Sequence, residues 1–215
     1  GNIGNGKAQL LFQYLNAKKE KGVYLGANAA LGRRGIRMKF FPENPILVYR
    51  PFHLNERNYL YLADRGRIYG DVRLFDDQGT GIHFYTNRED TIADQEMTVE
   101  LSRIDLKQFK KVLPYLPDVE GWLGGSLHYV DSEGQMMLSA DMNLDNFVYE
   151  KSPLGNWTMS GAYLPGDNNA HHVDGFITYN DQEIIYMNGV YQTDETGQEN
   201  ITGELELQHF PLRVI

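Results

Sequence analysis

The most constraining feature of this sequence is an alternation of apolar and polar residues that recurs along much of its 215 positions. Between Met136 and Leu144, every second residue is apolar and the residues between them are mostly polar. Successive side chains of a β-strand point to opposite faces, so a period of two predicts strands with one apolar and one polar face. Nine extended residues span roughly 30 Å at about 3.3 Å each, which is longer than most strands.

Turn signals separate the alternating runs. The form Asp-x-x-Gly occurs at 76–79, 131–134 and 194–197, and Asp64-Arg-Gly66 is a shorter version. We expect each Asp to cap a type I turn and each Gly to take the left-handed position after it, which makes a hairpin with a bulge. Consecutive strands are therefore predicted to be antiparallel neighbours in a meander.

Glycine recurs at one phase of the alternation. The pattern Gly-x-φ-x-Gly-x-φ-x-φ, where φ is apolar, occurs at 66–74 and 121–129, and its relatives lie at 156–163 and 199–207. The inner glycines fall on the apolar face, and they are Gly70, Gly125, Gly161 and Gly203. Glycine weakens a strand, so this placement indicates either close approach of another backbone or a crease. We favour a crease that curves the sheet lengthwise into a trough.

A second pattern, φ-x-φ-x-x-φ-x-φ, occurs at 99–106, 142–149 and 205–212. Its extra middle residue predicts a strand that bends or bulges near its end. The best candidate helix runs from Asp105, which can cap it, to Leu113, with a proline after it. We expect this helix to plug the end or an edge of the sheet.

The first 60 residues are less regular. Strands are expected near 9–15, 23–31 and 36–41. Prolines lie at positions 42, 45 and 51, and proline cannot donate to a strand ladder. We therefore expect only loops, edges and short strands between residue 42 and residue 60.

Composition excludes several function classes. The net charge is −9 and the basic runs are short, which argues against nucleic acid. The chain has no Cys, which excludes a thiolate metal site. His171 and His172 are adjacent and would point to opposite faces of a strand, so we interpret them as part of a polar hairpin loop. No nucleophile elbow or phosphate loop occurs, and we expect no enzyme, no catalytic residue, no metal and no cofactor.

The repeats at 66–74, 121–129 and 199–207, with Leu207-Gln-His-Phe-Pro-Leu212, resemble the C-terminal region of the TamB family, the translocation and assembly module proteins. The wider AsmA-like group has similar patterns. The stretch from Leu101-Ser-Arg-Ile-Asp-Leu106 to Gly121-Trp-Leu-Gly-Gly-Ser-Leu127 is also similar to theirs. The likeness covers roughly residues 60–215 and is a degenerate pattern without a catalytic signature.

The resemblance implies a long, U-shaped sheet with an apolar interior, called a β-taco. Such proteins lie in the envelope of Gram-negative bacteria, where they are anchored in the inner membrane and cross the periplasm. They are linked to outer-membrane assembly and to phospholipid movement between the membranes. The implied function is a non-catalytic periplasmic scaffold or conduit. It would carry lipid acyl chains or nascent outer-membrane protein strands, with the outer-membrane protein assembly machinery as a partner.

An apolar trough would solvate acyl chains by burying apolar area, at about 25 cal/mol per Å². The alternation of side chains along each strand, which we call its parity, predicts the residues that line the trough. They are Ile68, Val72, Leu74, Leu123, Leu127, Met136, Leu138, Met142, Leu144, Met159, Leu205 and Leu207. Parity does not distinguish a trough lining from a closed core. The alternative is therefore a closed β-sandwich that binds carbohydrate or a protein partner, with Trp122 and Trp157 as candidate stacking residues.

The chain opens with Gly1 and stops in the apolar run Phe210–Ile215, so we expect residues 1–215 to be one β-rich segment of a longer protein. A sub-boundary is expected near 90–120, at the short helix and its prolines. No apolar run is long enough to span a bilayer, and the membrane anchor is expected outside this segment.

Overall fold

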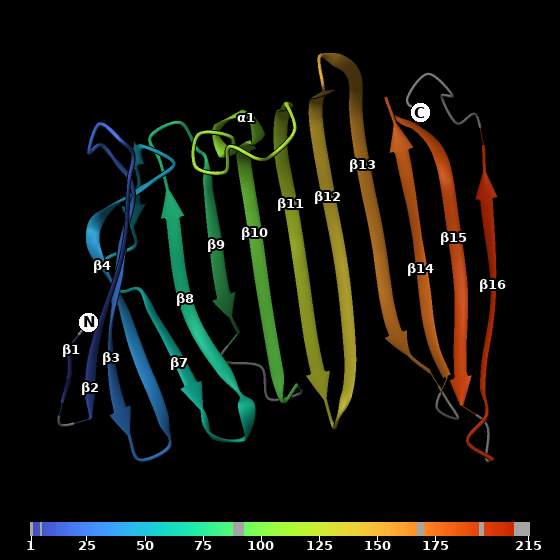
Figure 1. The fold of residues 1–215 in the computed structure, drawn as a ribbon. Coiled ribbons are helices and arrows are strands. Elements are labelled where there is room, and N and C mark those ends of the chain that lie inside the picture. Colours follow the sequence, from blue (N-terminus) through green and yellow to red (C-terminus); the bar gives the residue numbers. More distant parts are fainter. Residues whose placement is uncertain (1, 5, 88–92, 167–169, 194–195, 209–215) are drawn as a thin grey trace.

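A computed structural model describes residues 2–4, 6–87, 93–166, 170–193 and 196–208. Within these ranges the chain is all-β and forms one open, curved, antiparallel sheet with one short α-helix (Figure 1). The strands are β1 (Asn2–Gly4), β2 (Lys7–Leu15), β3 (Lys21–Gly32), β4 (Gly35–Leu47), β5 (Arg50–Pro51), β6 (His53–Leu54), β7 (Tyr59–Ala63), β8 (Ile68–Phe75), β9 (Gly81–Thr86), β10 (Gln95–Asp105), β11 (Val119–Ser132), β12 (Gln135–Tyr149), β13 (Ser152–Pro165), β14 (Ala170–Tyr179), β15 (Gln182–Thr193) and β16 (Glu199–Leu207).

The predicted meander is confirmed. The spatial order is β1-β2-β3-β4-β7-β8-β9-β10-β11-β12-β13-β14-β15-β16, and each neighbouring pair is antiparallel. The short strands β5 and β6 leave this order and pair with β4 and β8. The sheet continues through the 90–120 region, because β10 pairs directly with β11.

The Asp-x-x-Gly turns adopt two different geometries. At Asp76 the prediction is confirmed: its Oδ1 accepts hydrogen bonds of 2.9 Å from the backbone N–H groups of Gln78 and Thr80, and Gly79 has a φ of 80°. At 131–134 the prediction of a type I turn with a bulge is wrong. There β11 and β12 pair down to Ser132 and Gln135, so only two residues remain for the turn.

Those two residues, Glu133 and Gly134, have φ values of 53° and 81°. Two left-handed residues match the right-handed twist of the flanking strands, which is why two-residue hairpins favour them. Asp131 accordingly belongs to β11. In the third Asp-x-x-Gly, Asp194 lies outside the described residues.

Two of the predicted bulges are confirmed. In β10 the register shifts between Leu101 and Ile104, and Arg103 has a φ of 46°. In β12 it shifts between Leu144 and Phe147. The third predicted bulge extends past residue 208 and lies outside the described residues, as does the 210–215 run.

Strand β4 runs further than predicted, to Leu47, through both Pro42 and Pro45. Its pairing with β3 jumps from Gly26 opposite Phe41 to Tyr24 opposite Ile46. The prolines therefore lie in a bulged stretch, where the ladder needs no donor from them.

The helix is shorter than predicted. α1 spans only Leu106–Phe109, although Asp105 caps it as expected, with Oδ1 accepting a 3.1 Å hydrogen bond from the Lys107 N–H. The chain then continues in turns, in which the N–H groups of residues 112 and 113 donate to the Phe109 carbonyl. Leu113 remains 51% exposed, whereas Leu106 and Phe109 are half-buried.

Few apolar side chains are buried among the described residues. The buried ones come from widely separated parts of the structure, and they are Ala27, Pro45, Phe52, Leu54, Ala170 and Ile184. The described residues form one sheet and not the two packed layers of a sandwich. Both faces of most strands therefore meet solvent, and the apolar face is available for contact.

Candidate functional site

One face of the sheet carries unbroken rows of apolar side chains. The first row crosses β8 to β16 through residues that the register places opposite one another: Val72, Phe84, Val99, Leu127, Ala140, Gly161, Gly175, Met187 and Leu205. The second row crosses the same strands through Leu74, Ile82, Leu101, Gly125, Met142, Met159, Ile177, Ile185 and Leu207. Neither row contains a polar side chain. Eight interstrand steps of about 4.8 Å make each row roughly 38 Å long.

We call this surface the apolar face. All the residues predicted to line a trough lie on it. Those outside the two rows are Leu123 and Leu144, which pair with each other, Leu138, which pairs with Tyr129 and Tyr163, and Ile68 and Met136 near one rim. Sequence reasoning missed several further members, such as Phe84, Ile177 and Met187. The same alternation with glycine, as in Ile185-x-Met187-x-Gly189, would have found the last of these.

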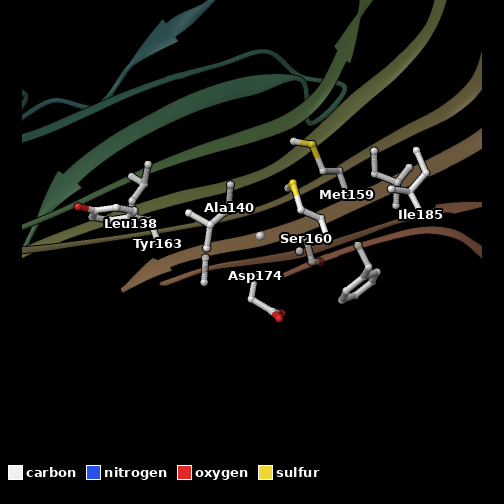
Figure 2. Close-up of a pocket in the computed structure, with 14 residues that line it drawn as sticks. Leu138, Ala140, Met159, Ser160, Tyr163, Asp174 and Ile185 are labelled. Carbon is white, nitrogen blue, oxygen red and sulfur yellow. The ribbon is translucent and has the colours of Figure 1, made fainter. Parts of the chain in front are cut away.

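The apolar face is open. None of the twelve predicted lining residues is buried, and Leu127, Met159 and Leu205 are 41%, 46% and 62% exposed. A hollow of about 230 Å³ lies over β12 to β15. Figure 2 shows Leu138, Ala140, Met159 and Ile185 of this hollow pointing to one side of the sheet, whereas Asp174 points to the other.

The sheet curves toward this face. Val23 of β3 and Leu47 of β4 share a hollow with Leu74 of β8 and Ile82 of β9, although other strands separate them in the sheet. β7 does not extend to this level, since it pairs with β4 only at residues 35–38 and with β8 only at residues 68–71, so the strands on either side of it line one hollow here. The apolar face is therefore concave over these strands, and we call its concave side the trough.

One end of the trough is covered. α1 lies at the upper end of β9 to β11 in Figure 1. Its Phe109 lines the same hollow as Phe52, which lies in the segment between β4 and β7. Phe52 and Leu54 are 8% and 7% exposed, so a small closed core forms here. This position agrees with the expectation that the helix plugs an end of the sheet.

The four predicted curvature glycines lie on the apolar face but not in one straight row. Gly161 is in the first row, Gly125 is in the second, and Gly203 is in the row of Leu138. Gly70 lies opposite Leu60. Gly125, Gly161 and Gly203 each lie one row further on, and such an oblique line suits a curled sheet, whose strands tilt relative to its axis. Gly70 does not lie on this line, because it is level with Thr86 and so with the row of Gly203. Their role in curvature stays a prediction.

Close backbone approach also explains some of these glycines. A Cβ on Gly125 would lie 2.2 Å from the Asp141 carbonyl oxygen, and one on Gly203 would lie 2.9 Å from that of Asn188. Gly161 differs, because its nearest neighbour would be a carbonyl oxygen 3.5 Å away. Close approach, the interpretation that the sequence favoured less, therefore applies at Gly125 and Gly203.

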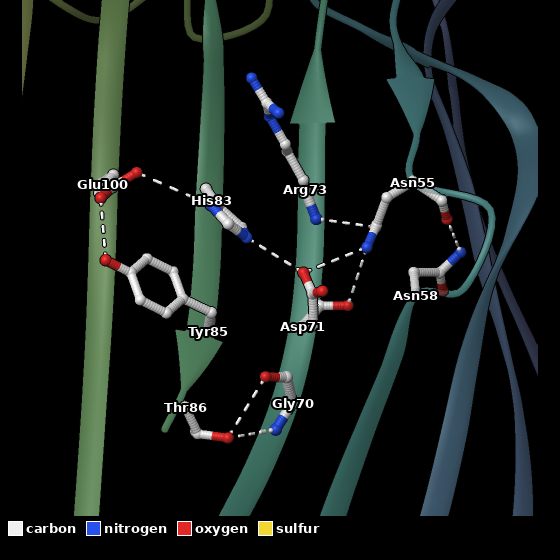
Figure 3. A network of polar contacts seen from close by, with 9 residues as sticks. All are labelled: Asn55, Asn58, Gly70, Asp71, Arg73, His83, Tyr85, Thr86 and Glu100. Atoms are coloured by element: carbon white, nitrogen blue, oxygen red, sulfur yellow. Dashed lines mark hydrogen bonds and ion pairs between the residues drawn. The ribbon is translucent and has the colours of Figure 1, made fainter. Parts of the chain in front are cut away.

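Near one rim, side chains replace missing backbone pairing between β8 and its neighbours. The Gln95 side chain, 8% exposed, donates to the Ile68 carbonyl and accepts from the Ile68 N–H, both at 2.7 Å. The Thr86 hydroxyl accepts from the Gly70 N–H at 3.0 Å (Figure 3). These bonds satisfy backbone groups of β8 that β9 does not reach.

The opposite face carries polar networks. His83 Nε2 lies 3.0 Å from Asp71 Oδ1, and its Nδ1 lies 3.7 Å from Glu100 Oε2 (Figure 3). Tyr85 donates a 2.9 Å hydrogen bond to Glu100, which raises the pKa of the tyrosine. These groups are cross-strand neighbours on the outer surface, with Asp71 and Glu100 nearly half exposed, and the arrangement stabilises strand pairing.

His171 and His172 lie within β14 and not in a loop, so the hairpin-loop interpretation is wrong. Residues 165 and 171 pair across β13 and β14, so His171 belongs to the strand ladder. His171 Nδ1 lies 2.6 Å from the Tyr163 hydroxyl, and the two rings stack. Within the described ranges, no group of three or more His, Cys, Asp or Glu side chains is placed to hold a metal ion.

Both tryptophan side chains contact neighbouring residues of the chain. The Arg103 guanidinium lies 5.3 Å from the centre of the Trp122 ring. Trp157 donates a 2.7 Å hydrogen bond to the Leu154 carbonyl and packs against Tyr179 at a ring distance of 5.1 Å. Both are half-buried, so they do not form the exposed platform that sugar stacking needs.

No protein-family model, curated protein or solved structure matches this chain. Among the described residues, no helix has the length and apolarity needed to cross a membrane. The resemblance to TamB and AsmA-like proteins therefore rests on the repeated residues alone.

Proposed function

We propose that this protein is a non-catalytic conduit of the bacterial cell envelope, whose trough holds lipid acyl chains. The observation that carries the proposal is the pair of unbroken apolar rows across nine strands, open to solvent. Folded domains rarely expose contiguous apolar surface of this kind unless it binds something. Each methylene group of a bound chain that leaves water contributes about 0.8 kcal/mol.

The dimensions suit a lipid tail. The rows are roughly 38 Å long, and the hydrocarbon core of a bilayer, two tails thick, measures about 30 Å. A tail lying along the rows would contact apolar side chains over its full length. The methionines at 142, 159 and 187 favour such a ligand, because a flexible thioether adapts to irregular chains.

An acyl chain fits this face better than a nascent protein strand does. A strand would bring backbone N–H and C=O groups, which need hydrogen-bond partners when they leave water. The two rows offer no polar side chain to supply them. The resemblance of the repeats to TamB supports a periplasmic location on a protein anchored in the inner membrane, and contact with the outer-membrane assembly machinery.

The test is titration of the purified chain with a dansyl-labelled fatty acid. We expect saturable fluorescence enhancement, and about tenfold weaker binding for Leu127→Asp, because a carboxylate at the middle of the first row would have to be desolvated beside the tail. Ser139→Asp is the matched control: it adds the same charge to β12, on the polar side and opposite His128, and should bind like the unchanged chain.

Equal binding by Leu127→Asp and the unchanged chain would contradict the proposal, as would the absence of saturable binding. Thermal stabilisation by glycans in place of fatty acid would favour the carbohydrate-binding alternative.

A further inference from the structure

In the part of the chain that the structure describes, the sheet has an unpaired edge at each end. Within the described residues, β16 is hydrogen-bonded only to β15, and every one of its residues is exposed. At the other end, β1 covers only Lys7–Gln9 of β2, so the stretch Leu10–Leu15 has a bare outer edge. Unpaired N–H and C=O groups on such edges are templates for a further strand.

The β2 edge is apolar on both faces. Leu10 and Phe12 lie on the trough side and are 54% and 65% exposed, and Leu11 and Leu15 on the other side are 47% and 45% exposed. An edge strand with apolar side chains on both faces is strongly favoured to be covered by another strand. On β16, Ile201 and Leu205 are similarly 80% and 62% exposed on the trough side.

The two ends carry opposite charge. Residues 1–60 contain ten Lys or Arg and three Asp or Glu, whereas residues 112–208 contain one Lys, no Arg and sixteen Asp or Glu. The strands follow one another in sequence order, so this asymmetry along the chain becomes an asymmetry across the sheet. The first strands form a basic end, and the last strands form an acidic end.

Charges of both signs lie at the bare edges themselves. Lys18 and Lys19 come shortly after β2, and both are exposed. Glu204 and Glu206 lie on the polar side of β16 and are exposed as well. Pairing two β16 edges would join two acidic ends, and pairing two β2 edges would join two basic ends, so like charges oppose both twofold dimers.

We infer that the β16 edge of one copy pairs with the β2 edge of a second copy, head to tail. Strand direction alternates along the sheet, so β2 and β16 run the same way and the new pair is parallel when the apolar faces are aligned. This orientation brings Lys18 and Lys19 near Glu206 of the next copy. The contact uses a different surface on each partner, so it builds open chains and prolongs the trough.

Sedimentation velocity of the lipid-free chain tests this inference separately from lipid binding. At 20 mM NaCl we expect species larger than dimers that grow with protein concentration. At 1 M NaCl, where the screening length falls to about 3 Å, we expect them to dissociate substantially. A chain that stays monomeric at low salt, or a dimer indifferent to salt, would overturn the inference.

Charge-reversed pairs sharpen the test. Glu204→Lys/Glu206→Lys makes both ends basic, and Lys18→Glu/Lys19→Glu makes both ends acidic. Each variant alone should self-associate about tenfold more weakly or worse, and an equimolar mixture should regain assembly. Glu133→Lys/Asp181→Lys is the control, because it changes the net charge equally at turns between inner strands. Failure of the mixture to reassemble, with both variants folded by circular dichroism, would refute edge pairing through these charges.

Discussion

Two glycines that face each other across β13 and β14 give a sharp test of the backbone packing. Gly161 lies opposite Gly175, and neither has a left-handed φ. A Cβ on Gly161 would have its nearest neighbour, the Asp174 carbonyl oxygen, at an ordinary 3.5 Å. A Cβ on Gly175 would lie 2.9 Å from the Ser160 carbonyl oxygen and 3.4 Å from the Cα of Gly161, and backbone atoms cannot easily move aside.

We therefore expect Gly161→Ala to stabilise the chain by about 0.5 kcal/mol, because alanine reduces the entropy of the unfolded state. Gly175→Ala has the same gain but forces a close contact that costs about 1–3 kcal/mol, so it should be net destabilising. Each kcal/mol of difference in the free energy of unfolding between the two variants corresponds to roughly 2–4 °C in Tm for a chain of this size.

Urea unfolding, followed by circular dichroism and by the fluorescence of Trp157 on the same strand, measures both free energies of unfolding. Each variant serves as the control of the other, since both replace glycine by alanine and both glycines lie in the first apolar row. Equal stability of the two variants, or a less stable Gly161→Ala, would refute the assignment of the tight contact to Gly175.

Two further predictions concern polar groups. Asn58→Ala should lower the free energy of unfolding by about 1–3 kcal/mol and speed hydrogen exchange of the Phe40 amide, because the buried Asn58 Oδ1 accepts that N–H at 2.8 Å; unchanged exchange would contradict this. The Lys110 ammonium lowers the pKa of Asp118, so its ion-pair contribution should persist above pH 3.8 and be lost as the pH falls through the lowered value. NMR titration should show that midpoint rise in Lys110→Gln.

The face of each strand could be predicted from sequence, because parity is a local property. From Met136 to Leu144, alternation assigned the apolar side that the register confirms. Bulges at Arg103 and Asn146 were also readable, since one extra residue interrupts the alternation on either side of them.

Other features depend on contacts with distant strands, which a local sequence pattern does not identify. The run through Pro42 and Pro45 stays in β4 because β3 tolerates a bulge there. The turn at Glu133 depends on how far two strands pair before they reverse. Gln95 reaches Ile68 on a strand 27 positions away, and nothing around either residue marks that contact in the sequence.

The meander has a consequence for how such a molecule changes length. Almost every long strand bonds only to its immediate predecessor and successor in the chain, so no strand must thread between two others. Architectures built this way behave as one-dimensional arrays, in which units are gained or lost at modest cost to the remainder. Duplication or deletion of a hairpin would lengthen or shorten the structure by two interstrand spacings, roughly 10 Å, without rearranging its connectivity.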